Sequence, residues 1–163
     1  INLSYVQILK SPLMMELKQM IDHSGISCSG IIVELTESGY LEGTPAVRSV
    51  WNDMKQLRIQ IALDDFGTGY SNLMNISNLE PDIVKLDRGF TLKALSRSYE
   101  YQLMQYVIEM VHKLNQYVCV EGVETKEDLE KIKALGPDLI QGYYYSKPCS
   151  RNEFLKKFFC YSE

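Results

Sequence analysis

The sequence predicts one α/β domain over residues 1–163, in which parallel strands alternate with helices. Three observations predict this fold class. Runs such as residues 31–35 and 83–86 are apolar at nearly every position, as in parallel strands covered on both faces. Amphipathic helical segments separate these runs. Successive strands begin about 20 to 35 residues apart, close to the unit length of a (β/α)8 barrel of about 250 residues.

The expected strands are residues 1–5, 31–35, 59–63, 82–87, 117–121 and 138–141. Each is a short, mainly apolar run bounded by a turn or by a helix signal. Six strands are two short of a closed barrel. The pattern alone therefore leaves two architectures open, namely about six βα units of a (β/α)8 barrel and a six-stranded open doubly wound sheet.

The expected helices are residues 11–25, 44–57, 72–79, 91–115, 125–136 and 150–159. Serine or threonine followed by proline opens the first two. Gly25 and Gly136 end the first and the fifth. Residues 125–128 and 150–153 have the capping-box pattern of a helix start. A break in the long helix is expected near residues 96–98.

Composition limits the possible class of protein. With 45% hydrophobic and 23% charged residues and a net charge of −4, the chain is typical of a globular domain and gives no reason to expect DNA as a partner. Its four cysteines, at positions 28, 119, 149 and 160, lack metal-finger spacing and are interpreted as reduced, mostly buried thiols of a cytoplasmic protein. The first residue is Ile1 rather than Met, so we expect a fragment of a longer parent protein. That parent could be tethered to a membrane.

Polar side chains occur within or at the end of every expected strand, as Asn2, Glu34, Asp64 and Asp65, Lys85, Glu121 and Gln141. Each alone has an ordinary explanation, such as a strand-edge amide or a lysine that reaches solvent. In a barrel the strand ends converge on one face, so together they indicate a functional site. At Asp64 and Asp65 we expect the chain to be leaving the sheet, which lets both carboxylates reach one cation. Gly67 and Gly69 then allow a positive φ close to a ligand.

The chemistry of this set favours a hard cation. Carboxylates with amides and one lysine suit Mg²⁺ better than zinc or iron, and His23 and His112 lie within helices away from this face. Two cations about 3.5–4 Å apart would suit in-line attack on a phosphodiester. One would lower the pKa of a bound water, and the other would neutralise phosphate charge. Lys85, close to that water, could orient it or transfer a proton.

Six segments stand in the order of a known family, namely Asn2-Leu3-Ser4, Glu34-Leu35-Thr36-Glu37-Ser38, Asp64-Asp65-Phe66-Gly67-Thr68-Gly69-Tyr70-Ser71, Lys85-Leu86-Asp87, Glu121-Gly122-Val123-Glu124-Thr125 and Gln141-Gly142-Tyr143. On these segments, which span almost the whole chain, the sequence resembles the EAL domain family. That family consists of bacterial cyclic di-GMP phosphodiesterases with a modified (β/α)8, or TIM, barrel.

The resemblance implies that two Mg²⁺ or Mn²⁺ ions are held by Asn2, Glu34, Asp64, Asp65 and Glu121. It implies that Lys85 contacts the catalytic water, and it leaves open whether Glu121 is the general base. The residues that it implies for substrate binding, or for a loop that couples the metals to a dimer interface, are Glu37, Phe66, Gly67, Thr68, Gly69, Tyr70, Ser71, Glu124 and Gln141. The implied reaction is hydrolysis of cyclic di-GMP to linear pGpG by a homodimer, with sensor or GGDEF-type cyclase domains expected in the parent.

The Glu-Ala-Leu motif that names the family does not occur in the sequence. In the family it lies on a strand upstream of the position of Asn2. We therefore expect this chain to be the C-terminal two-thirds of such a domain, without its first two strands and one metal carboxylate. Weak or absent hydrolysis and an association-prone sheet edge follow for the chain alone. An inactive cyclic di-GMP receptor is the alternative to the enzyme, and a structural dimerisation domain is the third possibility.

Overall fold

The computed structural model describes residues 1–9, 12–36, 44–68, 76 and 79–159. In them, six strands form one fully parallel sheet. The strands are β1 (Asn2–Leu3), β2 (Ile32–Thr36), β3 (Gln60–Phe66), β4 (Ile83–Leu86), β5 (Tyr117–Glu121) and β6 (Leu139–Gln141). Their order in space is their order in the sequence. This is the order of a barrel wall, whereas a doubly wound sheet reverses its strand order, so the barrel alternative is confirmed.

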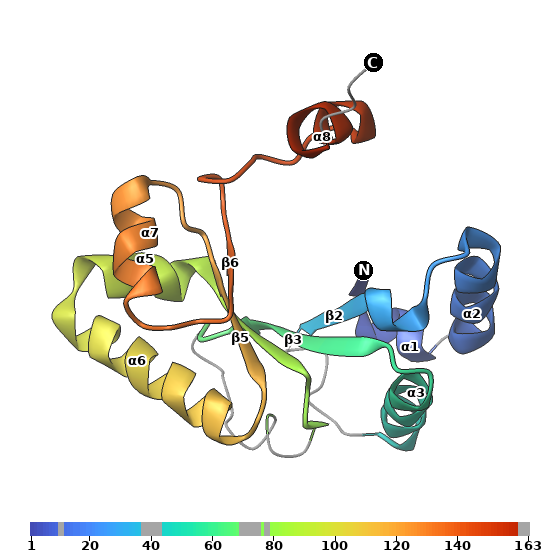
Figure 1. Cartoon of the computed structure of the whole chain (residues 1–163). Coiled ribbons are helices and arrows are strands. Elements are labelled where there is room, and N and C mark those ends of the chain that lie inside the picture. Colours follow the sequence, from blue (N-terminus) through green and yellow to red (C-terminus); the bar gives the residue numbers. More distant parts are fainter. Residues whose placement is uncertain (10–11, 37–43, 69–75, 77–78, 160–163) are drawn as a thin grey trace.

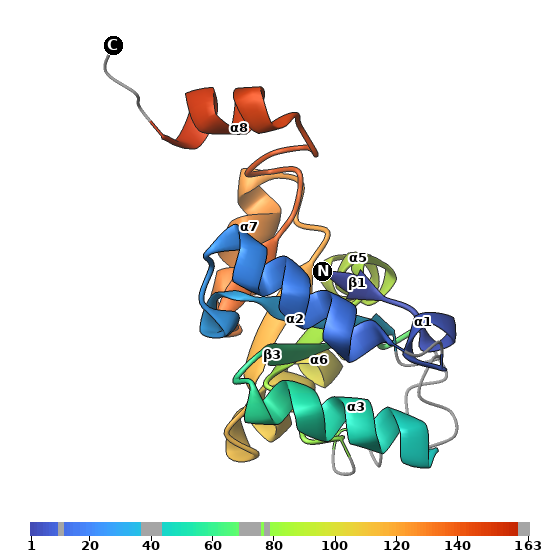
Figure 2. The same ribbon diagram turned by 90° about the vertical axis from the view of Figure 1, so that its right-hand side faces the viewer.

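Helices flank the strands on the outside of the sheet (Figures 1 and 2). The described helices are α1 (Tyr5–Leu9), α2 (Leu13–Ser24), α3 (Pro45–Gln56), α5 (Arg88–Ser96), α6 (Ser98–Lys113), α7 (Lys126–Lys133) and α8 (Arg151–Phe158), with a short 3-10 helix at Cys28–Gly30. Helices α2 and α3 lie beside one half of the sheet, and α5, α6 and α7 lie beside the other (Figure 1). None of the described helices is long and apolar enough to cross a membrane.

Most helix ends follow their sequence signals. Gly25 ends α2 in the left-handed conformation, and both predicted capping boxes are present at α7 and α8. The predicted break is confirmed, because Arg97 is extended between α5 and α6. Two predicted helix starts were wrong. Helix α5 begins at Arg88 rather than Thr91, because Asp87 caps it by accepting a hydrogen bond from Gly89 N–H. Pro12, and not the residue before it, is the N-cap of α2. Ser11 and most of the helix expected over 72–79 lie outside the described residues.

The two faces of the sheet have separate cores. The larger core packs between the strands and the helices and includes Ile61, Leu63 and Val84. A smaller cluster on the opposite face consists of Ala62, Ile83 and Cys119 with Ile32 packed against them. Side chains alternate along a strand, so residues two positions further on share that second face.

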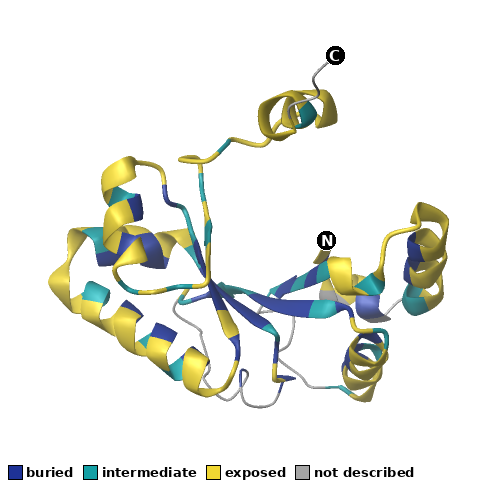
Figure 3. Ribbon diagram, in the orientation of Figure 1, coloured by how far each residue is buried: buried dark blue, intermediate teal, exposed yellow. Residues whose placement is uncertain are grey.

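The cysteine prediction was wrong in part. Of the three described cysteines, all free thiols, Cys119 is buried, Cys28 is intermediate and Cys149 is exposed. Cys149 lies between β6 and α8, a stretch that is largely exposed, and α8 itself contains no buried residue (Figure 3). Its phenylalanines are not part of the described core, since α8 lies away from the rest of the fold (Figure 1).

The amino ends of β4 and β6 are fixed by the same arrangement. Asp82 donates its N–H to Ile61 O (2.9 Å) and accepts from Ile61 N–H through its carboxylate (2.8 Å). Asp138 makes the same two bonds with Val118, at 3.1 Å and 2.8 Å. A proline precedes each aspartate. These two Pro-Asp braces tie the starts of β4 and β6 to the neighbouring strands.

Replacing Asp138 with asparagine should lower stability in a pH-dependent way. Burial acts to raise the pKa of this carboxyl, but hydrogen bonds from Val118 N–H and from His112 Nε2, 2.9 Å away, lower it below the ordinary 3.8. A lowered pKa stabilises the fold above about pH 4 and loses this effect as the pH falls through the lowered value. We expect the variant to lose about 1 kcal/mol at pH 7, with the difference shrinking as the pH falls below the ordinary value and through the lowered pKa of Asp138. Thermal melts across pH, with Asp22→Asn on exposed α2 as control, measure this.

Candidate functional site

A buried lysine is the centre of the polar cluster. The Nζ of Lys85 lies 3.0 Å from Glu34 Oε2, 3.1 Å from Asp64 Oδ1 and 2.7 Å from Glu121 Oε1. Lys85 is 5% exposed, so it does not reach solvent in the way a strand-end lysine can. The four side chains come from β2, β3, β4 and β5. The sequence prediction that these residues converge is confirmed.

Strand alternation explains the convergence. Glu34, Asp64, Lys85 and Glu121 each follow a member of the small inner cluster by two residues, and so they extend from the same face of the sheet. The polar layer formed by these four side chains therefore lies nearer the carboxyl ends of the strands than the apolar layer does. This is the end of the sheet at which barrel enzymes have their active sites.

The charges in this layer do not balance. Three carboxylates face one ammonium, which leaves two negative charges uncompensated. Burial acts to lower the pKa of Lys85, but hydrogen bonds from its ammonium to Glu121 and Glu34 outweigh burial and raise it above its ordinary value. Burial also raises the pKa of the Glu121 carboxyl, against the effect of Lys85. Lys85 is therefore a cation at neutral pH.

Asp65 has an unusual backbone. Strand β3 continues through Phe66, so the expectation that the chain leaves the sheet at the acid pair was wrong. The pairing with β4 shifts register between Leu63 and Phe66, and Asp65 has φ +61° within this irregularity. A bulge explains how two neighbouring acids both lie at one strand end. Burial and then the charge of Asp64 raise the pKa of Asp65.

The other predicted residues are placed differently. Asn2 pairs in register with Glu34, and Gln141 with Glu121, but both are exposed. Phe66 is 3% exposed and belongs to the core. Gly67 has the predicted positive φ, +102°, and a Cβ there would meet the ring of Phe90. Thr68 is exposed, and four further predicted residues lie outside the described residues, namely Glu37, Gly69, Tyr70 and Ser71.

The donor atoms of this layer suit a divalent metal by type, but their present spacing is set by Lys85. Glu34, Asp64 and Glu121 offer oxygen ligands, and their uncompensated charge matches a hard dication. Within the described ranges, no group of three or more histidine, cysteine, aspartate and glutamate side chains is spaced to hold a metal ion. The three carboxylates bond to Lys85, so a cation would have to take over some of these contacts.

Arg88 was missed by the sequence reasoning. Its Nε and Nη2 donate to Glu124 Oε1, at 3.2 Å and 2.7 Å. Its side chain also lies against Gly122, where a Cβ would be 2.8 Å from the Cβ of Arg88. Arg88 lies just after the end of β4, and Gly122 just after the end of β5. A search for polar side chains at strand ends, which selected Lys85, could therefore have found Arg88 as well.

Replacing Gly122 with alanine should be strongly destabilising. Gly122 has φ +80° and no space for a Cβ beside Arg88, whereas Gly136 has φ +75° and no neighbouring atom within 4 Å of such a Cβ. Gly136→Ala should cost about 1 kcal/mol from backbone strain, and Gly122→Ala about 1–3 kcal/mol more from overlap. Urea unfolding of both variants gives the comparison. Equal losses would show that the contact with Arg88 is loose.

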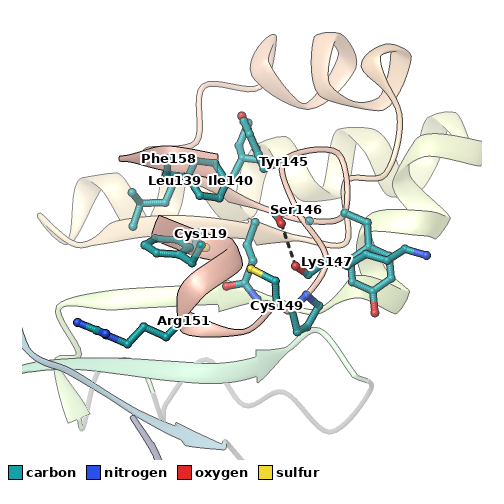
Figure 4. A pocket seen from close by; sticks show the side chains of 14 residues that line it. Cys119, Leu139, Ile140, Tyr145, Ser146, Lys147, Cys149, Arg151 and Phe158 are labelled. Atoms are coloured by element: carbon teal, nitrogen blue, oxygen red, sulfur yellow. Dashed lines mark hydrogen bonds between the residues drawn. The ribbon is translucent and has the colours of Figure 1, made fainter. Parts of the chain in front are cut away.

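A cavity of about 860 Å³ lies along β6, between this strand and α8 (Figure 4). Its lining is mainly apolar and aromatic, with Leu139, Ile140, Tyr145, Phe154 and Phe158 among the residues. Gln141 and Cys119 line it as well. The cavity therefore borders the inner face of the sheet beside the polar layer, but not the Lys85 cluster itself.

Comparison with known proteins gives a consistent result. The EAL domain family model matches residues 1–148. The cyclic di-GMP phosphodiesterase PdeF of Escherichia coli K12 is 32% identical over 148 residues, which cover 91% of this chain and 20% of PdeF.

Two solved structures are also similar. The EAL enzyme Bd1971, in its cAMP- and cyclic di-GMP-bound form, has a TM-score of 0.90 at 29% identity over 96% of this chain and 41% of that one. Klebsiella pneumoniae BlrP1, in a manganese and cyclic di-GMP complex, has 0.84 at 26% identity over 91% and 38%. The chain thus spans about a fifth to two-fifths of these proteins. Its residues 1–148 and its barrel wall place the chain in the EAL domain family.

Proposed function

We propose that this chain is the C-terminal two-thirds of a metal-dependent phosphodiesterase domain that hydrolyses cyclic di-GMP to linear pGpG. The observation that carries the proposal is the polar layer in which Glu34, Asp64 and Glu121 surround Lys85. The names of PdeF, Bd1971 and BlrP1 support the substrate.

The residues proposed to hold two Mg²⁺ or Mn²⁺ ions are Asn2, Glu34, Asp64, Asp65 and Glu121. Bound ions would supply Lewis-acid chemistry, polarising the phosphate and lowering the pKa of the attacking water. Lys85 is proposed to orient the carboxylates, because its ammonium donates to all three of them. It is also proposed to place a positive charge near the phosphate. Glu121 accepts the proton of the attacking water. A water oxygen bonds to phosphorus, the P–O3′ bond breaks, and the leaving O3′ takes up a proton.

We further propose that two barrel strands with a Glu-Ala-Leu motif precede Ile1 in the parent protein. Strands β1 and β6 each pair with a described strand on one side only, and an apolar cavity lies along β6. These features support closure of the barrel by further strands. A homodimer with linked sensor or cyclase domains is part of the same proposal, and the small share of PdeF that the chain covers is compatible with it.

Chromatographic detection of pGpG tests the function. The parent protein should convert cyclic di-GMP with Mn²⁺ or Mg²⁺, and Ca²⁺ should inhibit it. Glu121→Gln should reduce the rate by about 10²-fold or more, while Glu130→Gln on exposed α7 should not. Cyclic di-GMP binding by the metal-loaded parent without any cleavage would favour the receptor alternative, and absence of binding would favour a structural domain.

A further inference from the structure

The segment that carries Glu121 into the following loop is held from two sides. On one side is Arg88, the first residue of α5, whose stem lies against Gly122 and whose guanidinium bonds to Glu124. Arg88 thus contacts both ends of the three-residue segment 122–124. Because Gly122 turns the chain with φ +80° directly after Glu121, this contact fixes the point where the strand ends.

On the other side the segment is fixed by the end of β6. Val123 N–H donates to Gln141 O (3.3 Å), and Tyr144 N–H donates to Val123 O (3.1 Å). A Cβ on Gly142 would overlap the backbone of Val123, so the two chains are in direct contact. The segment therefore has a backbone partner on one side and a side-chain partner, Arg88, on the other.

We infer that Arg88 is a positioning residue for Glu121. Its stem blocks one side of the turn and its guanidinium holds Glu124, which together keep the Glu121 carboxylate directed at Lys85, 2.7 Å away. The mechanical part of this inference stands on the contacts alone. Its effect on turnover rests on the proposed function.

Variants can separate the stem from the charge. Arg88→Met keeps the stem and removes the ion pair, and Arg88→Lys keeps the stem and a charge. Arg97→Met is the matched control, because Arg97 pairs with Glu100 (3.1 Å) at the opposite end of α5 from Arg88.

Amide hydrogen exchange and NMR read the position without requiring activity. Arg88→Met should reduce protection of the Val123 and Tyr144 amides by about threefold and should shift the carboxyl ¹³C resonance of Glu121. The Val84 amide in β4 should keep its protection. Arg88→Lys should restore part of both signals, and Arg97→Met should change neither. Unchanged exchange and resonance in Arg88→Met, or equal loss at Val84, would overturn the inference.

Turnover by the parent protein provides the second readout. Arg88→Met should lower kcat about tenfold with KM within about twofold, because Glu121 acts in the bond-making step. A raised KM at unchanged kcat would mean that Arg88 binds substrate directly, which overturns the positioning role. If the parent protein hydrolyses nothing while the exchange results hold, the proposed function fails and the positioning of Glu121 stands.

Discussion

Replacing Lys85 with methionine is expected to abolish hydrolysis. It is also expected to make the stability of the fold depend more strongly on bound metal ions. Methionine keeps the length of the stem but removes the charge that three carboxylates share at 2.7–3.1 Å. Loss of the partner of a buried ion pair costs about 3–5 kcal/mol, and the partial exposure of Glu34, Asp64 and Glu121 reduces this to about 2–3 kcal/mol. The rate should fall by at least about 10²-fold.

Manganese should then stabilise the variant more than the native protein. Without the ammonium, the same carboxylates repel one another until a cation enters. Thermal melts with EDTA and with Mn²⁺ measure the gain for each protein. Lys93→Met, on the exposed side of α5, is the control and should respond as the native protein does. Equal metal-dependent gains for Lys85→Met and the native protein would argue against a cation site at these carboxylates.

Replacing Asp65 with asparagine is expected to remove activity without unfolding the domain. Asparagine tolerates positive φ, so it can adopt the +61° of Asp65. Because burial and the nearby charge of Asp64 raise the pKa of the Asp65 carboxyl, its ionised form is disfavoured in the fold, and the amide relieves this. The melting temperature should stay the same or rise, while the rate of cyclic di-GMP hydrolysis should fall by about 10²–10³-fold.

Asp65→Ala provides the contrast. Alanine lacks the short polar side chain that eases the left-handed conformation, so it should cost about 1–2 kcal/mol of stability as well as activity. Parallel melts and rate measurements on the two variants separate the strain from the charge. An active Asp65→Asn enzyme would remove Asp65 from the proposed ligand set.

The sheet and most helix ends could be predicted because their signals are local. Apolar runs gave the strands, and capping residues such as Thr125 and Ser150 gave two helix starts. One local signal was overlooked. Ser4 and Gln7 form a capping box that opens α1, with Gln7 Oε1 2.8 Å from Ser4 N, so the five-residue helix was predictable.

The convergence of Glu34, Asp64, Lys85 and Glu121 could be predicted from the sequence, but their arrangement could not. Alternation and strand ends select Glu34, Lys85 and Glu121, since both are properties of the sequence. That Lys85 is buried between three carboxylates depends on neighbouring strands, which no local pattern specifies. The bulge at Asp65 was missed for the same reason, because a positive φ at an aspartate in a strand has no distinct sequence signal.

The Pro-Asp braces have a consequence for how the domain responds to substitutions in its polar layer. A one-residue slip of β4 would turn Lys85 to the other face, but Asp82 anchors that strand at its opposite end through two bonds to Ile61. The register of β4 is thus fixed at its amino end, away from the polar layer at its carboxyl end. Substitutions among the carboxylates can therefore alter the chemistry of this end without shifting the register of the strand that carries Lys85.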